Sequence, residues 1–153
     1  MQIKLIYEWF LLIFIALCCT EAHSHGGVFL EDDVCLIQIG FYKAHFTIYQ
    51  PKKTQHKQYC EDIPEATESI FVMKFIHNGL REVPIDFRII RDVLGRGPYF
   101  KEEDLKQISN IDHVTEFYRA PLIQQDGLLL ALHEFKKEGN YVGIVTASVP
   151  DNI

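Results

Sequence analysis

The chain has 153 residues, of which 15 are Lys or Arg and 21 are Asp or Glu, giving a formal net charge of −6. Binding to phosphate groups needs a cationic surface, so this charge argues against a nucleic-acid partner and against adhesion to anionic lipid. The length suits one domain, and the sequence contains no internal repeat and no low-complexity tract.

An apolar run of nine residues near the amino terminus, from Trp9 to Leu17, is typical of a secretory signal peptide. A membrane span would need ~20 apolar residues. Thr20 and Ala22 supply the small residues expected before a cleavage site. We therefore predict a signal peptide over residues 1–22 and a single periplasmic or secreted domain over residues 23–153, with no membrane span in the mature chain. The alternative is an uncleaved N-terminal anchor.

Cleavage after Ala22 would place His23 at a free amino terminus, followed by Ser24 and His25. Two copper geometries are then open. In a square-planar site the amine, two backbone amides and the His25 ring bind the ion. In a histidine brace the amine and the His23 ring bind it, and a second imidazole completes the site. Both suit Cu(II), which favours nitrogen-rich tetragonal sites.

His45 is the best candidate for that second imidazole, because it lies on the more polar face of its predicted strand. We therefore predict a copper site built from His23, His25 and His45. The acidic run Glu31 to Asp33 could orient an imidazole ligand through hydrogen bonds. The alternative is an exposed terminus that binds copper only adventitiously.

Strand patterns fill most of the remaining chain. Val34 to Phe41 is rich in β-formers, and Ala44 to Tyr49 alternates apolar with polar residues. The other predicted strands are Ser69 to His77, the stretch around Ile85 to Ile89, Gly127 to Phe135 and Tyr141 to Ala147. The last two flank a short turn with Gly139, which predicts a β-hairpin.

One segment differs from these strands. Residues 101–111 carry Leu105, Ile108 and Ile111 three apart, with acidic residues early, and this pattern predicts one short helix. Six or seven short strands with a single helix predict an all-β fold, an Ig-like antiparallel β-sandwich, because half-apolar strands must bury one face against a second sheet. The antibody-type Cys-Trp-Cys spacing is absent, since the one Trp of the chain is Trp9.

The two cysteines beyond the signal segment are Cys35 and Cys60. An exported chain meets an oxidising compartment, where a pair of thiols usually forms a disulfide. We predict a Cys35–Cys60 bridge. The alternatives are a separate, inert pair of thiols, or a free Cys60 that binds metal.

The stretch "DGLLLALHEFKKEGNYVGIVTA", residues 126–147, resembles the closing hairpin of the YtkA-like and FixH-like periplasmic domains, in which Gly139 and Tyr141 match the turn. The stretch "LREVPIDFRIIRD" resembles a preceding strand of those domains. The resemblance implies a small exported sandwich, in some members associated with copper handling or oxidase assembly. FixH-like proteins keep a membrane helix, whereas this chain has only its N-terminal apolar segment.

Several other polar residues have simpler interpretations. His133 shares a strand face with Leu129 and Phe135, which favours a packed histidine. The segment "CEDIPEATE", residues 60–68, carries four carboxylates without the regular spacing of a calcium loop, which favours a solvated acidic loop. Asp86 and Asp92 could form a carboxylate pair only if the fold brought them together.

The sequence contains no nucleophile elbow, no zinc-protease motif and no phosphate-binding loop. We therefore expect a non-enzymatic protein. The favoured function is an exported copper carrier or chaperone that uses His23 after cleavage. The alternative is a metal-free interaction module, or an accessory subunit of a membrane or envelope complex.

Overall fold

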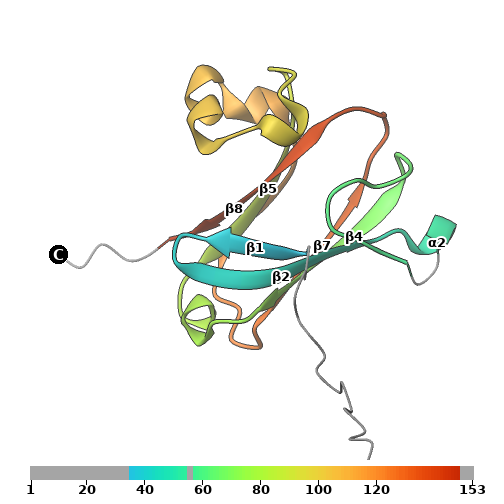
Figure 1. Ribbon diagram of the computed structural model, residues 1–153. Helices are drawn as coiled ribbons and strands as arrows, with labels where there is room; N and C mark the ends of the chain where they lie inside the picture. Colours follow the sequence, from blue (N-terminus) through green and yellow to red (C-terminus); the bar gives the residue numbers. More distant parts are fainter. Residues whose placement is uncertain (1–34, 55–56, 149–153) are drawn as a thin grey trace, which may run out of the picture. The chain divides into compact units, whose positions relative to one another are not determined.

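The structure, a computed structural model, describes residues 35–54 and 57–148, which form two antiparallel β-sheets (Figure 1). The first sheet contains β1 (Leu36–Ile39), β2 (Tyr42–Tyr49), β3 (Gln58–Tyr59), β4 (Glu68–Phe75) and β7 (Leu128–Glu134). Its order is β1-β2-β4-β7, with β3 beside β2. The second sheet contains β5 (Ile85–Arg91), β6 (Thr115–Leu122) and β8 (Tyr141–Ala147), in the order β6-β5-β8. The predicted all-β sandwich is confirmed.

The alternating pattern of β2 places its side chains as the sequence predicts. Ala44 and Ile48 are buried at 0% and 5% exposure, and Phe46 packs against the same core. Because successive strand residues point to opposite faces, His45 lies on the outer face of the first sheet. The predicted strand at Ser69 to His77 is β4, and its inner face is equally well buried, with Met73 at 0% exposure.

Aromatic rings join the two sheets at their centre. Phe87 of β5 is 1% exposed, and its ring centroid lies 5.4 Å from that of Phe71 in β4 and 6.1 Å from that of Phe46 in β2. Phe117 of β6 lies on another side of the same ring, with centroids 6.0 Å apart. Inner-face residues of both sheets therefore form one continuous hydrophobic core.

The predicted hairpin between Gly127–Phe135 and Tyr141–Ala147 is wrong, although both strands exist. β7 pairs with β4 in the first sheet, whereas β8 pairs with β5 in the second. The segment between them therefore crosses from one sheet to the other. The alternating pattern specifies which face of a strand is buried, but it does not specify the neighbouring strand, and a short turn with Gly139 suits either connection.

The predicted single helix over residues 101–111 is replaced by two short 3₁₀ helices, η3 (Glu102–Gln107) and η4 (Ile111–Val114). The three-residue spacing of the apolar side chains matches the 3.0 residues per turn of a 3₁₀ helix better than the 3.6 of an α-helix. Asp104 holds η3 together, because its carboxylate accepts hydrogen bonds from the Lys101 backbone N–H and the Gln107 amide. The other described helices are α2 (Pro51–Thr54), η1 (Asn78–Arg81) and η2 (Gly97–Tyr99).

Strand β6 was absent from the sequence prediction. It is an edge strand, it contains Pro121, and its last residues are exposed, so it lacks the clean alternation of a half-buried strand. It pairs with β5, and Arg88 of β5 contacts the face of the Tyr118 ring at 4.2 Å. Arg88 also forms an ion pair at 2.7 Å with Asp112 of η4, which directly precedes β6. Within the described residues no helix is long and apolar enough to cross a membrane.

We expect Phe87→Ala to lower the free energy of unfolding by about 3–5 kcal/mol, because it removes the ring that contacts both sheets and leaves a cavity between them. Urea unfolding followed by fluorescence measures this change. The matched control is Phe41→Ala, since Phe41 is 74% exposed, and it should change stability by less than about 0.5 kcal/mol. Equal effects of the two substitutions would contradict this view of the core.

Candidate functional site

The junction between the N-terminal segment and the sandwich is fixed by β2. Strand β1 pairs with β2 over residues 42–45 and β3 pairs with it over residues 48–49, while β4 lies along the opposite edge. The two short strands therefore follow one another along the same edge of β2. Cys35 directly precedes β1, and its carbonyl accepts a hydrogen bond from the Phe46 backbone N–H at 2.7 Å. Cys60 directly follows β3.

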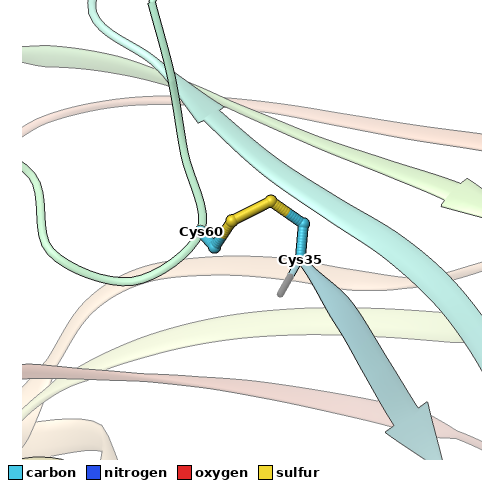
Figure 2. The surroundings of a disulfide bond; sticks show 2 residues. All are labelled: Cys35 and Cys60. Atoms are coloured by element: carbon cyan, nitrogen blue, oxygen red, sulfur yellow. A yellow bond between two sulfur atoms is a disulfide. The ribbon is translucent and has the colours of Figure 1, made fainter. Parts of the chain in front are cut away.

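This arrangement brings the two cysteines together beside the middle of β2, and they form the predicted disulfide (Figure 2). Their Cα atoms lie 4.8 Å apart, within the range that a disulfide spans without backbone movement. The bridge ties the start of β1 to the loop that follows β3. Since Cys60 is in the disulfide, a free Cys60 thiolate as metal ligand is excluded for this state of the protein.

The predicted copper ligands are only partly within the described residues. His23 and His25 lie outside them. His45 lies in β2, directly opposite Leu36 of β1 and Lys74 of β4, and its side chain is partly buried. The described chain begins at Cys35, so His45 lies close to the place where the N-terminal segment joins the sheet. Within residues 35–54 and 57–148, no three His, Cys, Asp or Glu side chains are grouped closely enough to hold a metal ion.

The remaining histidines have separate environments. The Nδ1 atom of His77 accepts a hydrogen bond from the Lys43 backbone N–H at 2.9 Å, so it helps to hold the end of β4 beside β2. His113 is exposed in the last turn of η4. His133 is packed, as predicted: its ring lies between the sheets, with centroids 4.7 Å from Phe135 and 5.7 Å from Phe117.

The ring of His133 lies in an apolar setting that disfavours its protonated form. Its Nε2 atom is buried and has no hydrogen-bond partner among the described residues. Burial lowers the pKa of His133 from its ordinary value, the charges of Glu116 and Glu134 oppose the shift, and Lys136 adds to it. A neutral imidazole is a metal ligand in principle, but the neighbours of this one are aromatic rings, so the site is structural.

Two of the four carboxylates in residues 60–68 form ion pairs with lysines. Glu65 pairs with Lys53 of α2 at 2.7 Å, and Glu68, at the start of β4, pairs with Lys52 at 3.3 Å. These ion pairs fit the predicted solvated loop.

Asp86 is near the start of β5 and Asp92 directly follows its end, ~20 Å apart at the usual rise of a strand, so they do not form a carboxylate pair. Burial raises the pKa of Asp86, whereas a hydrogen bond with Thr146 and the charge of Arg88 oppose the shift. The carboxylate of Asp92 accepts hydrogen bonds from the backbone N–H groups of Leu94 and Gly97, so it shapes the loop that follows.

One surface feature escaped the sequence analysis. The outer face of the first sheet carries partly exposed apolar side chains on β4 and β7, among them Leu130 at 50% and Leu132 at 58% exposure. The signal was present in the sequence. Residues 128–132 are apolar at every position, so both faces of this strand are apolar, although β7 is an edge strand of its sheet.

Comparisons with known proteins support the fold. No protein-family model matches the sequence, and no curated protein matches it. Among solved structures, the soluble domain of PmoD from Methylocystis sp. ATCC 49242 (Rockwell) is similar, with a TM-score of 0.65 and 26% sequence identity over 80% of this chain and 91% of that domain. The chain therefore resembles a known soluble domain over most of its length, and the resemblance to YtkA-like and FixH-like domains remains a prediction.

We expect the Cys35→Ser, Cys60→Ser double variant to lose about 2–4 kcal/mol of unfolding free energy, because the bridge restricts the unfolded chain. Urea unfolding with and without reductant measures this loss. The stability of the double variant should be the same with and without reductant, whereas the parent chain should lose stability when it is reduced. An unchanged midpoint for the reduced parent chain would contradict the stabilising role.

His133 should make the sandwich less stable in mild acid. Because burial lowers the folded-state pKa, the unfolded chain binds a proton at this position more readily than the folded one. The resulting stability is fully present above the unfolded pKa of about 6.5 and is lost as the pH falls below it. Urea unfolding between pH 5 and 8, in ~0.5-unit steps, should show that the unfolding free energy falls less with decreasing pH in His133→Phe than in the parent chain. Phe41→Ala is the control, because Phe41 is exposed and carries no titratable group, so the variant should keep the parent slope.

Proposed function

We propose that this chain is an exported β-sandwich that binds copper at its new amino terminus, as a carrier or chaperone. The observation that carries the proposal is the sequence His23-Ser24-His25 directly after the predicted cleavage site. A free amine with an imidazole at the third position offers Cu(II) the nitrogen-rich tetragonal set that it favours. We propose no catalytic activity.

The disulfide supports export, because bridges between cysteines persist in oxidising compartments such as the periplasm. It also fixes where the N-terminal segment is attached. Cys35 is twelve residues after His23, and twelve residues span at most about 43 Å when fully extended. His45 lies one residue from this attachment point along the paired strands, so the length of the segment allows a brace in which His45 supplies the second imidazole.

The likeness to the soluble domain of PmoD supports a sandwich that acts as a soluble domain. We propose that it works in the envelope, beside a membrane or envelope protein complex to which it delivers the ion. The N-terminal segment, if uncleaved, would instead serve as an anchor, and His23 would then lack the free amine that the copper site needs.

A second candidate function is a metal-free interaction module, or an accessory subunit of an envelope complex. The exposed leucines of β7 favour it, because contiguous apolar side chains on a sheet face mark surfaces that bind other proteins. The two candidates differ in their need for the free amine of His23.

The copper proposal predicts that the mature chain begins at His23, which intact mass spectrometry of exported protein measures. One added glycine between Ala22 and His23 should then weaken Cu(II) binding by orders of magnitude, because it moves the amine out of the chelate. A titration against a competing chelator measures the affinity. The affinity for Cu(II) should also fall as the pH drops through about 6.5, since the ligands must lose protons to bind.

Single substitutions separate the two geometries. His25→Ala should destroy the square-planar site, whereas a brace should survive His25→Ala and fail in His45→Ala. The matched control is His113→Ala, because His113 is exposed in η4, far along the chain from the junction. If the glycine-extended chain binds copper as tightly as the mature chain, the N-terminal site is wrong. If neither binds, the interaction module is the better proposal.

A further inference from the structure

The outer face of the first sheet carries a continuous apolar stripe, formed by Ile70, Val72, Leu130 and Leu132. These residues lie in two directly paired rows, with Ile70 opposite Leu132 and Val72 opposite Leu130. They alternate with inner-face residues that are fully buried in the core, such as Met73 and Leu129. The stripe is therefore an extra apolar surface beyond what the sandwich needs to fold.

Half or more of the surface of each stripe leucine is exposed, at 50% for Leu130 and 58% for Leu132. Single exposed leucines are ordinary on soluble proteins, but a paired set on a flat sheet face marks an interaction surface. The edge of β7 is partly protected, because the Arg119 guanidinium donates a hydrogen bond to the Leu130 carbonyl. The face of the sheet, rather than its edge, is therefore the surface left to bind a partner.

Opposite charges lie at the two ends of the stripe. Glu68 and Glu134 face each other across the strands at one end, and Lys74 lies opposite Leu128 at the other. Glu68 already pairs with Lys52 of α2. Within the described part of the chain, Lys74 and Glu134 are exposed and neither forms an ion pair. The stripe thus presents a free cation at one end and a free anion at the other.

We propose that the stripe binds a second copy of this chain, with the first sheets of the two copies face to face. The two-fold axis lies between these two sheets and is perpendicular to their strands. Such an axis reverses the strand direction, so it places the Lys74 end of each copy over the Glu134 end of the other. The four apolar side chains of one copy then meet those of the second copy. Each sheet gains the apolar cover on its outer face that the other sheet of its own sandwich provides inside.

The charge pattern favours a second copy over an unrelated protein. A two-fold interface uses the same patch on both molecules, so that patch must be complementary to itself. A patch with charge of one sign would repel its own copy, whereas acid at one end and base at the other attracts it. This matters because each chain carries a formal net charge of −6, so two copies repel each other elsewhere.

The size of the stripe sets the expected strength. Two strands present a smaller surface area than the ~800 Å² per partner of a standard interface. We therefore expect a weak dimer whose fraction rises with protein concentration. Sedimentation velocity over a concentration series, with EDTA present, measures this. EDTA removes any dimer that a bound metal ion holds together, so the result is independent of the proposed copper site. The chain is expressed from its full-length sequence, so that processing occurs as in the cell.

Three variants test the interface. The Leu130→Asn, Leu132→Asn double variant should be monomeric at every concentration, whereas Leu122→Asn, at an exposed leucine of β6 outside the stripe, should dimerise like the parent chain. Lys74→Glu should raise the dissociation constant by about tenfold or more, because it places like charges opposite each other. Adding Glu134→Lys to Lys74→Glu should recover part of the affinity, since it restores opposite charges in the reversed order.

Urea unfolding of each variant shows that the monomer is still folded. The proposal is overturned if the parent chain is monomeric throughout the series or dimerises only when metal is supplied. It is also overturned if the leucine variant still dimerises, or if the double charge exchange binds no better than Lys74→Glu alone. A monomeric chain whose stripe instead binds an unrelated protein would show that the surface is real and its occupant is not a second copy.

Discussion

The contact between Phe87 and Phe71 is the interaction on which the rest of the molecule depends. Each sheet is too small to exclude water from its own inner face, so neither is stable without the other. Phe87 lies at the centre of that shared surface, and rings from β2, β4 and β6 surround it. Which face of each strand is buried and which lies outside follows from the way the two sheets meet at this ring.

The outer faces of the two sheets differ in how far other parts of the chain cover them. The second sheet carries Arg88, whose side chain is 17% exposed and is held by Asp112 and Thr115 at the end of the segment of 3₁₀ helices. Side chains of that segment thus contact the outer face of β5. On the β4–β7 half of the first sheet, Lys52 of α2 contacts Glu68 at one end, while Leu130 and Leu132 are exposed. The interaction surface is therefore on the first sheet, and His45 lies on the same face.

The sequence pattern predicted burial well and pairing poorly. Alternation in β2 and β4 identified the residues that fill the core, because the side-chain period of a strand is a local property. The partner of β7 depends on contacts far along the chain, so the expected hairpin with β8 was wrong. Strand β6 escaped notice because an edge strand with Pro121 and exposed residues needs little apolar patterning.

At the candidate site, the Cys35–Cys60 bridge was predictable from the expected export and the two cysteines of the mature chain, whereas its geometry depends on two strands sharing one edge of β2. His45 was correctly placed on the outer face by the same alternation, while His23 and His25 lie outside the described residues.

The disulfide also determines how the molecule would carry a mechanical load. Strand β1 has only four residues, and its hydrogen bonds to β2 would open one after another if the chain were pulled from its amino-terminal end. Cys35 precedes β1, so a force applied through residue 34 reaches the sulfur bridge first and passes to Cys60. The load is then shared with the loop after β3 instead of falling on β1 alone. A force on the amino-terminal segment, from a bound ion, a partner or a membrane, therefore need not break the hydrogen bonds between β1 and β2.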